Sequence, residues 1–114
     1  MQYPDWIWHN GAIKRWADAT THVMSHALHY GSSVFEGIRC YQTPNGPVIF
    51  RLTDHNTRLF ASAKIYDMAM PYSLEQINAA CREVLKANDN TTDYLRPVAY
   101  RGLGGFGLSA DTPT

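Results

Sequence analysis

One stretch of sequence decides the fold, and it reads Ser33-Val34-Phe35-Glu36-Gly37-Ile38-Arg39-Cys40-Tyr41. Apolar side chains recur along it at spacings typical of a β-strand, at Val34, Phe35, Ile38 and Tyr41. Pro44-Asn45-Gly46-Pro47 has turn composition. The following Val48–Arg51 is β-branched and aromatic, so the two segments predict a β-hairpin.

Upstream of this hairpin, the sequence predicts another. Trp6–Trp8 is rich in residues that favour strands, and Asn10-Gly11 is the strongest short signal for a hairpin turn. Ala12–Trp16 forms the returning strand. Thr20–Gly31 has no sustained periodicity, and we expect a loop with one helical turn.

Downstream, two helices are predicted. Thr53 is expected to cap the first helix, with Asp54 in its first turn, and one apolar face carries Leu59, Ala63 and Tyr66. Ser73 and Gln76 have the spacing of a capping box for the second helix. The apolar residues that follow have helical spacing: Leu74, Ile77, Ala80, Cys81, Val84 and Leu85.

A last strand is predicted at Tyr94–Tyr100, with Pro97 at a position that needs no hydrogen-bond donor. The order of strands, two helices and a strand indicates an α+β fold in a single domain, residues 1–114. The two helices are expected to pack on one face of a largely antiparallel sheet.

Composition excludes several classes of protein. The 114 residues include 10 basic and 10 acidic side chains, so there is no excess positive charge for nucleic acid. No apolar run is long enough to span a membrane, and the first residues lack a secretory signal. Cys40 and Cys81 have no zinc-site spacing and fit reduced thiols better than a disulfide. We therefore expect a cytoplasmic globular protein.

Two motifs resemble binding sites and are better explained otherwise. His22, His26 and His29 have no acidic or cysteine residue between them, so local hydrogen bonding is favoured over a metal site. Gly102–Gly107 resembles a phosphate-binding loop but lacks the lysine and the helix that such loops need. It is better explained as a mobile loop whose backbone approaches another group closely.

The remaining candidates are anion-binding side chains. Arg58 lies on the first predicted helix, where spacing alone favours a solvated position, although a guanidinium is suited to bind phosphate. Tyr94 and Arg96 share a strand face and could hold a carboxylate. Glu36 could act as an acid or base, but no second carboxylate or nucleophile accompanies it.

The run from Val23 to Tyr41 resembles the signature of bacterial branched-chain amino-acid aminotransferases, a family of the fold-type IV, pyridoxal-phosphate-dependent class. The similarity continues through three further segments: Ile7–Gly11, Arg58-Leu59 with Ser62–Tyr66, and Tyr94–Pro97. It implies a transferase of branched-chain amino-acid biosynthesis, and the chain would be its N-terminal small domain. D-amino-acid transaminases and aminodeoxychorismate lyases share the hairpin and the helix arginine, so they remain alternatives.

This resemblance implies roles for individual residues. Arg58 would bind the phosphate of pyridoxal 5'-phosphate, and Arg96 would receive the distal carboxylate of glutamate. Substrate-pocket positions are matched by five residues: Phe35, Gly37, Arg39, Tyr94 and Arg96. Tyr30, Phe106 and Leu108 would reach the neighbouring subunit's pocket, which implies a homo-oligomer.

The resemblance also implies a missing part. In this family the Schiff-base lysine comes from a larger C-terminal domain, and Lys14, Lys64 and Lys86 lie in contexts that look exposed. We therefore predict that the 114-residue chain alone is inactive, with weak or no cofactor binding, and that exposed apolar surface makes it self-associate. A free-standing anion-binding or interaction module is the alternative from another class.

Overall fold

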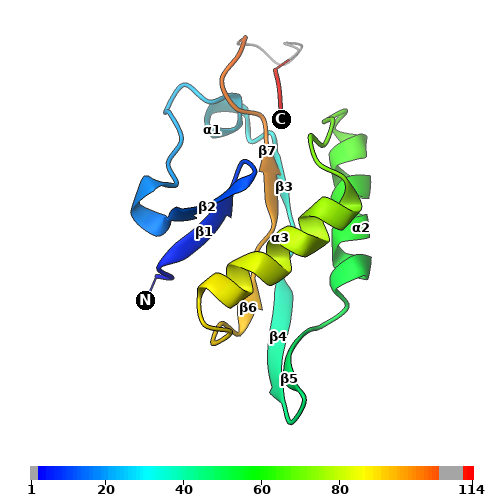
Figure 1. Cartoon of the computed structure of the whole chain (residues 1–114). Coiled ribbons are helices and arrows are strands. Elements are labelled where there is room, and N and C mark those ends of the chain that lie inside the picture. Colours follow the sequence, from blue (N-terminus) through cyan, green and yellow to red (C-terminus); the bar gives the residue numbers. More distant parts are fainter. Residues whose placement is uncertain (1–2, 106–111) are drawn as a thin grey trace.

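The centre of the molecule is a ribbon of two antiparallel segments, which the computed structural model describes along with the rest of residues 3–105 and 112–114 (Figure 1). One segment comprises β3 (Ser33–Phe35) and β4 (Ile38–Thr43), and the other comprises β6 (Tyr94–Leu95) and β7 (Val98–Tyr100). The two predicted strands are thus present, but each is interrupted.

Pro97 explains the interruption. β3 pairs with β7 through Phe35 opposite Val98, and β4 pairs with β6 through Ile38 opposite Leu95, so both pairs share one register. Continuing that register places Glu36 opposite Pro97. The Glu36 amide donates to the Pro97 carbonyl at 3.0 Å, but proline has no N–H to return the bond. Pro97 therefore lies where a donor would have continued the ladder, so the prediction that none is needed there was wrong, and the missing donor interrupts the strand.

β5 (Gly46–Ile49) completes the predicted hairpin with β4, through Cys40 opposite Ile49. It begins two residues earlier than Val48 and ends before Arg51. The turn is supported by the Thr43 hydroxyl, which donates to the Gly46 carbonyl at 2.6 Å. Every described strand pair is antiparallel.

α2 (Leu52–Ile65) starts differently from the prediction. Arg51, with φ of 52°, is the N-cap residue, and Thr53 is already inside the helix. The Thr53 hydroxyl instead accepts a hydrogen bond from Asn78 Nδ2 at 3.2 Å, so a tertiary contact uses the group that was expected to cap the helix. Asp54 lies in the first turn as predicted. Tyr66 is exposed beyond the helix end, so its predicted place on the apolar face was wrong.

α3 (Leu74–Ala87) begins as the sequence predicts. The Gln76 amide donates to Ser73 Oγ at 3.1 Å, and the Ser73 amide donates to Gln76 Oε1 at 2.8 Å, which is a complete capping box. The predicted apolar face is confirmed, with four buried positions at Ile77, Ala80, Cys81 and Leu85.

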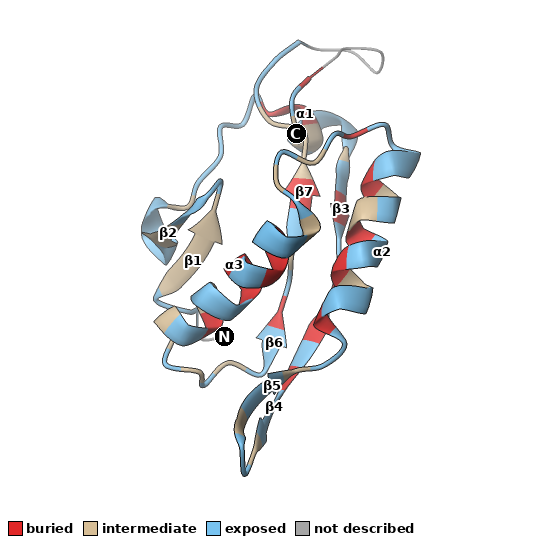
Figure 2. Ribbon diagram, turned by 45° about the vertical axis from the view of Figure 1, so that its right-hand side comes forward, coloured by how far each residue is buried: buried red, intermediate tan, exposed pale blue. Residues whose placement is uncertain are grey.

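The two helices cover one face of the ribbon, and Figure 2 shows their buried residues on the sides that face the strands. One apolar cluster joins α2 to β3 and β7 through Val34, Leu59, Ala63 and Ala99. Another joins α3 to β4 and β6 and includes both cysteines, which are free thiols. The predicted α+β class, with helices on one face, is confirmed.

A separate hairpin lies beside α3 (Figure 1). β1 (Trp6–His9) pairs with β2 (Ala12–Arg15) through a turn in which Asn10 and Gly11 have φ of 50° and 97°, as the Asn-Gly pair predicts. Asn88, the C-cap of α3, accepts from the Trp6 amide at 3.1 Å and donates to the Trp6 carbonyl at 3.0 Å. These bonds attach the hairpin to the end of the helix.

The loop between β2 and β3 contains a short 3₁₀ helix, η1 (Trp16–Asp18), and the single helical turn that the sequence predicts, α1 (His26–Tyr30). Gly31 ends α1 with φ of 67°. In the described part of the chain, no helix has the length and apolar character of a membrane span.

Candidate functional site

The face of the ribbon that the helices leave uncovered carries the predicted substrate residues. Strand alternation sends Val34, Glu36 and Ile38 toward the helices. It leaves the intervening positions of both segments exposed, at Phe35, Gly37, Arg39, Tyr94 and Arg96. We call these five residues the pocket wall, after the role that the family resemblance predicts for them. The sequence predicted them one by one, and the shared register places all five on one surface.

Four members of the pocket wall are in contact. The Tyr94 hydroxyl accepts from Arg96 Nε at 3.2 Å and from Arg96 Nη2 at 3.0 Å. The Arg96 guanidinium carbon lies 4.3 Å from the centroid of the Phe35 ring, within the range of a cation–π contact. A Cβ on Gly37 would lie 2.6 Å from Tyr94 Oη. Glycine leaves room for this close approach, since a larger residue would displace the exposed end of the tyrosine.

The pocket wall has the composition of a site for an amphipathic ligand. Phe35 and Tyr94 keep 55% and 42% of their surface exposed and offer apolar area. Arg96 uses two donors on Tyr94 and has others available for a carboxylate. Arg39 stands opposite Tyr94 across the β4–β6 pair, at the edge of the same face.

Arg58, on α2, is paired with Glu36 on the helix-covered face of the ribbon, at the point where its strands are interrupted. Arg58 Nε donates to Glu36 Oε2 at 2.8 Å, and Arg58 Nη2 donates to Oε1 at 2.7 Å. His55 Nδ1 lies 2.8 Å from the same Oε1. Arg58 is therefore exposed, as its spacing suggested, but it is not a free cation. It is one half of a bidentate ion pair.

Glu36 is the functional candidate whose partner the sequence did not reveal. It is 4% exposed, whereas the Arg58 side chain is 70% exposed. The Arg58 hydrogen bond lowers the pKa of Glu36 from its ordinary value and outweighs the opposing effect of burial. The pKa of Arg58 is raised by the same hydrogen bond. One signal was available, since an acid between Val34 and Ile38 occupies a position that alternation assigns to the interior.

The three loop histidines hydrogen-bond locally, which their spacing favours. His22 Nδ1 accepts from the Met24 amide at 3.0 Å, His26 Nδ1 lies 2.7 Å from Ser32 Oγ, and His29 Nε2 donates to the Val23 carbonyl at 2.8 Å. In residues 3–105 and 112–114, no three metal-binding side chains gather at one point.

The residues predicted to cross to a partner subunit are only partly described. Tyr30 ends α1, is 40% exposed, and its ring lies 4.5 Å from that of His26 between centroids. Phe106 and Leu108 lie outside the described residues. In the glycine-rich segment, the Thr112 hydroxyl donates to the Gly105 carbonyl at 3.0 Å, so a side chain closely approaches the backbone there.

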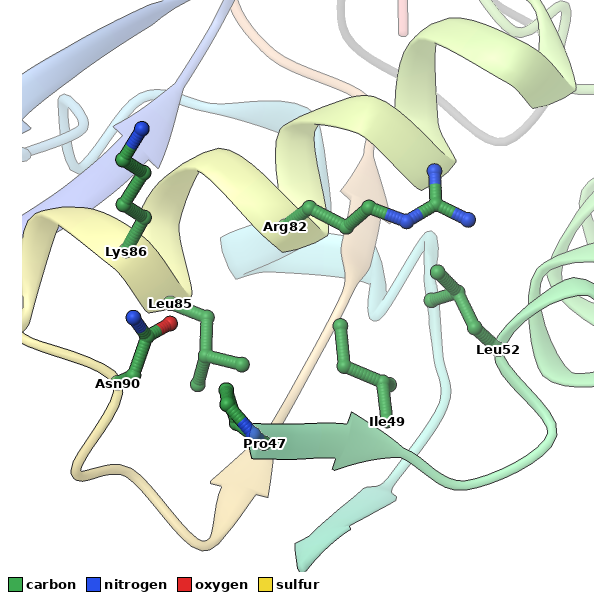
Figure 3. A pocket seen from close by; sticks show the side chains of 7 residues that line it. All are labelled: Pro47, Ile49, Leu52, Arg82, Leu85, Lys86 and Asn90. Atoms are coloured by element: carbon green, nitrogen blue, oxygen red, sulfur yellow. The ribbon is translucent and has the colours of Figure 1, made fainter. Parts of the chain in front are cut away.

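Two hollows lie away from the pocket wall. Figure 3 shows the first, of about 310 Å³, between β5 and α3. Ile49, Leu52 and Leu85 give it an apolar lining, the charged end of Lys86 points away from it, and the guanidinium of Arg82 extends toward Leu52. The amide of Asn90 is a further polar group in its lining.

The second hollow, of about 380 Å³, lies between the β1–β2 hairpin and β7. His9 lines it and bonds on one side to Tyr100 Oη at 3.3 Å and on the other to Lys14 Nζ at 3.2 Å. Burial, with a contribution from Lys14, lowers the pKa of His9. Both ring nitrogens of this histidine thus already have partners.

With this geometry in place, comparison with known proteins defines the class. The chain belongs to the amino-transferase class IV family, whose model matches residues 33–114. The match covers both segments of the ribbon, both helices and therefore the pocket wall together with Arg58.

Within that class, the chain is similar to branched-chain-amino-acid aminotransferases, as its sequence signature predicts. It is 51% identical to that of Escherichia coli strain K12 over 105 residues, covering 92% of this chain and 34% of the relative. It is 50% identical to that of Pseudomonas aeruginosa over 104 residues, covering 91% and 34%. The chain thus spans about a third of the length of the curated relatives that it matches.

Solved structures agree with this. The branched-chain amino acid aminotransferase of Escherichia coli superposes with a TM-score of 0.93 at 48% identity, covering 97% of this chain and 37% of that chain. The enzyme of Thermobaculum terrenum, solved in its PLP-bound holo form, superposes with a TM-score of 0.80 at 35% identity, covering 93% and 35%. The expected fold family is therefore confirmed.

Proposed function

We propose that these 114 residues form one part of a branched-chain amino-acid transaminase that uses pyridoxal 5'-phosphate. The reaction would move the amino group of L-leucine, L-isoleucine or L-valine to 2-oxoglutarate, giving a branched 2-oxo acid and L-glutamate. One observation carries this proposal. The same ribbon has the pocket wall on its open face and, where its strands are interrupted, Glu36 bonded to Arg58.

The donor set of Arg58 fits a phosphate. Its bonds to Glu36 use Nε and one hydrogen of Nη2, and a guanidinium has five N–H donors. Three donors are left on a side chain that is 70% exposed. When bound, pyridoxal 5'-phosphate supplies the electron sink for amino transfer. This chain would contribute the grip on the phosphate.

The pocket wall fits the two kinds of substrate that such a reaction alternates between. Phe35 and Tyr94 offer apolar surface to a branched side chain. Arg96, already oriented by Tyr94, offers its remaining donors to the distal carboxylate of glutamate. Arg39 would contribute at the edge of the same face.

The remaining parts of the proposal concern what these residues work with. The Schiff-base lysine would come from a further segment of the parent protein, and residues 1–114 alone would be inactive. Lys64 and Lys86 are exposed on helices, and Lys14 contacts His9 on the β1–β2 hairpin. Tyr30, Phe106 and Leu108 would serve a neighbouring subunit's pocket in a homo-oligomer. A cytoplasmic location stays a prediction from the sequence.

A chimera tests the proposal. Residues 1–114 would replace the matching third of the Escherichia coli relative, and transamination would be measured with L-leucine and 2-oxoglutarate. We expect turnover, and we expect Arg58→Ala to weaken cofactor binding. Arg96→Ala should raise the KM for 2-oxoglutarate about 10- to 100-fold, the effect of losing a charge-assisted hydrogen bond, with a smaller effect on L-leucine. A folded chimera that is active on D-alanine and not on L-leucine would contradict the proposal.

A further inference from the structure

Glu36 is a buried carboxylate at the junction of two candidate subsites. Its neighbours Phe35 and Gly37 belong to the pocket wall, while its own side chain points to the opposite, helix-covered face. A buried charge is costly unless it is paired and hydrogen-bonded. The position is therefore informative, because an apolar residue there would complete the alternation of Val34 and Ile38 without that cost.

Glu36 holds one end of the Arg58 side chain, which is otherwise exposed. Both carboxylate oxygens receive a donor from Arg58, at 2.8 and 2.7 Å, and His55 adds a third contact at 2.8 Å. An ionised carboxylate only accepts hydrogen bonds, so His55 Nδ1 donates. The fork of Arg58 is consequently fixed in one orientation, although 70% of the side chain is exposed.

The backbone of Glu36 ties the same point to the opposite segment. Its amide donates to the Pro97 carbonyl at 3.0 Å, and Pro97 directly follows Arg96. One residue therefore links Arg58 on α2, the Phe35–Gly37 side of the pocket wall and the Arg96 side. A shift of Glu36 would move all three relative to one another.

We propose that Glu36 is a positioning residue that presents the unbonded donors of Arg58 to the phosphate and sets their distance from the pocket wall. This inference rests on the proposed function, and it goes beyond that function by assigning a role to Glu36. A long arginine side chain loses conformational freedom when it binds an anion, and restraint in advance reduces that loss.

The proposal makes a prediction with a definite sign. A carboxylate beside a phosphate repels it, so electrostatics alone would have phosphate bind more tightly once Glu36 is neutralised. If Glu36 positions Arg58, phosphate should bind more weakly in Glu36→Gln, since the substitution releases Arg58. The direction of the change therefore separates the two roles.

The first measurement uses the chain itself and does not depend on the proposed function. In nitrogen-15 spectra, the Arg58 Nε–H should exchange slowly with water because it is bonded to Glu36 Oε2. Glu36→Gln should speed this exchange about tenfold or more, whereas Glu83→Gln, at an exposed position on α3, should leave it unchanged. Adding inorganic phosphate to the unsubstituted chain should leave the signal protected. Faster exchange of the Arg58 Nε–H on adding phosphate to the unsubstituted chain would overturn the proposal.

The second measurement uses the chimera and two ligands. Glu36→Gln should weaken binding of pyridoxal 5'-phosphate about tenfold and leave the weaker binding of pyridoxal, which has no phosphate, unchanged. Damage that is merely structural would weaken both. Glu83→Gln is the control, and amide spectra verify folding. Unchanged or tighter binding of pyridoxal 5'-phosphate in Glu36→Gln overturns the inference alone. If Arg58→Ala also binds it normally, the proposed function is overturned with it.

Discussion

The hydroxyl of Tyr94 occupies the space that a side chain on Gly37 would need, 2.6 Å from the position of a Cβ atom. The contact is diagonal across the ribbon and holds together the pocket wall, because the same hydroxyl accepts both hydrogen bonds from Arg96. A methyl group on Gly37 would therefore act on Arg96 through Tyr94.

Gly37→Ala should push Tyr94 aside and free Arg96, while changing stability by less than about 1 kcal/mol, since the displaced ring is half exposed and can move. In the chimera, we expect the KM values for L-leucine and 2-oxoglutarate to rise about tenfold. Gly102→Ala is the matched control, because a Cβ there meets nothing within 4 Å. Unchanged KM values in Gly37→Ala would show that the contact does not shape the pocket.

Acid should weaken the fold through Glu36. Its pKa is lowered by the Arg58 hydrogen bond from an ordinary value of 4.5, so its contribution is present above that value and is lost as pH falls through the lower folded-state pKa. Urea unfolding between pH 7 and pH 3 should show the unsubstituted chain losing its advantage over Glu36→Gln. Glu83→Gln should instead follow the unsubstituted chain. A constant difference down to pH 3 would mean that Glu36 does not titrate in this range.

Asn78→Ala should destabilise the fold by removing a hydrogen bond between α2 and α3. Asn78 Oδ1 accepts from Asn56 Nδ2 at 2.8 Å, and Asn56 is fully buried. The substitution removes this bond and leaves the buried amide only its long contact with Cys81 Sγ at 3.7 Å, which costs about 1–3 kcal/mol. Urea unfolding at neutral pH measures the loss, and Glu83→Ala on the exposed face of α3 should change stability by no more than about 0.5 kcal/mol. A loss for Asn78→Ala as small as that would indicate that water replaces the bond.

Arg101→Lys should loosen the end of α2. The guanidinium donates to the Thr112 carbonyl at 2.7 Å and to the Tyr66 and Asp67 carbonyls at 3.0 Å each. An ammonium keeps the charge but lacks the planar fork that spans these acceptors. We expect amide hydrogen exchange at Tyr66 and Asp67 to speed up about tenfold, with α3 unchanged. Arg82→Lys is the control, and equal exchange in both variants would contradict a specific role for Arg101.

Predictions based on neighbouring residues were confirmed. The Asn10-Gly11 turn and the Ser73–Gln76 capping box depend on chemistry within four residues, which is visible in the sequence. Periodicity likewise identified α3. The Thr53 cap was wrong, since the helix begins at Leu52 with Arg51 as its N-cap, and the Thr53 hydroxyl instead accepts from Asn78, 25 residues away.

The predictions for the candidate site show the same difference between local sequence patterns and contacts of distant residues. Family resemblance proposed the five residues of the pocket wall, and alternation placed Tyr94 and Arg96 on one strand face, but they did not indicate that Gly37 makes room for Tyr94. They also left Glu36 without a partner, because its ion pair with Arg58 joins positions 22 residues apart. Contacts of this kind depend on the pairing of distant segments.

Sequence by itself thus determined the element types, the α+β class and the family, since each rests on local propensity, spacing or a long specific run of residues. Tertiary structure alone decided that the segments of Glu36 and Pro97 pair in one unbroken register. That register turned the alternating pattern of Ser33–Tyr41 into two surfaces, an open wall on one side and a buried carboxylate holding Arg58 on the other. The physical reason is that the two faces of a strand differ in burial only when it pairs with another segment and a helix layer covers one face.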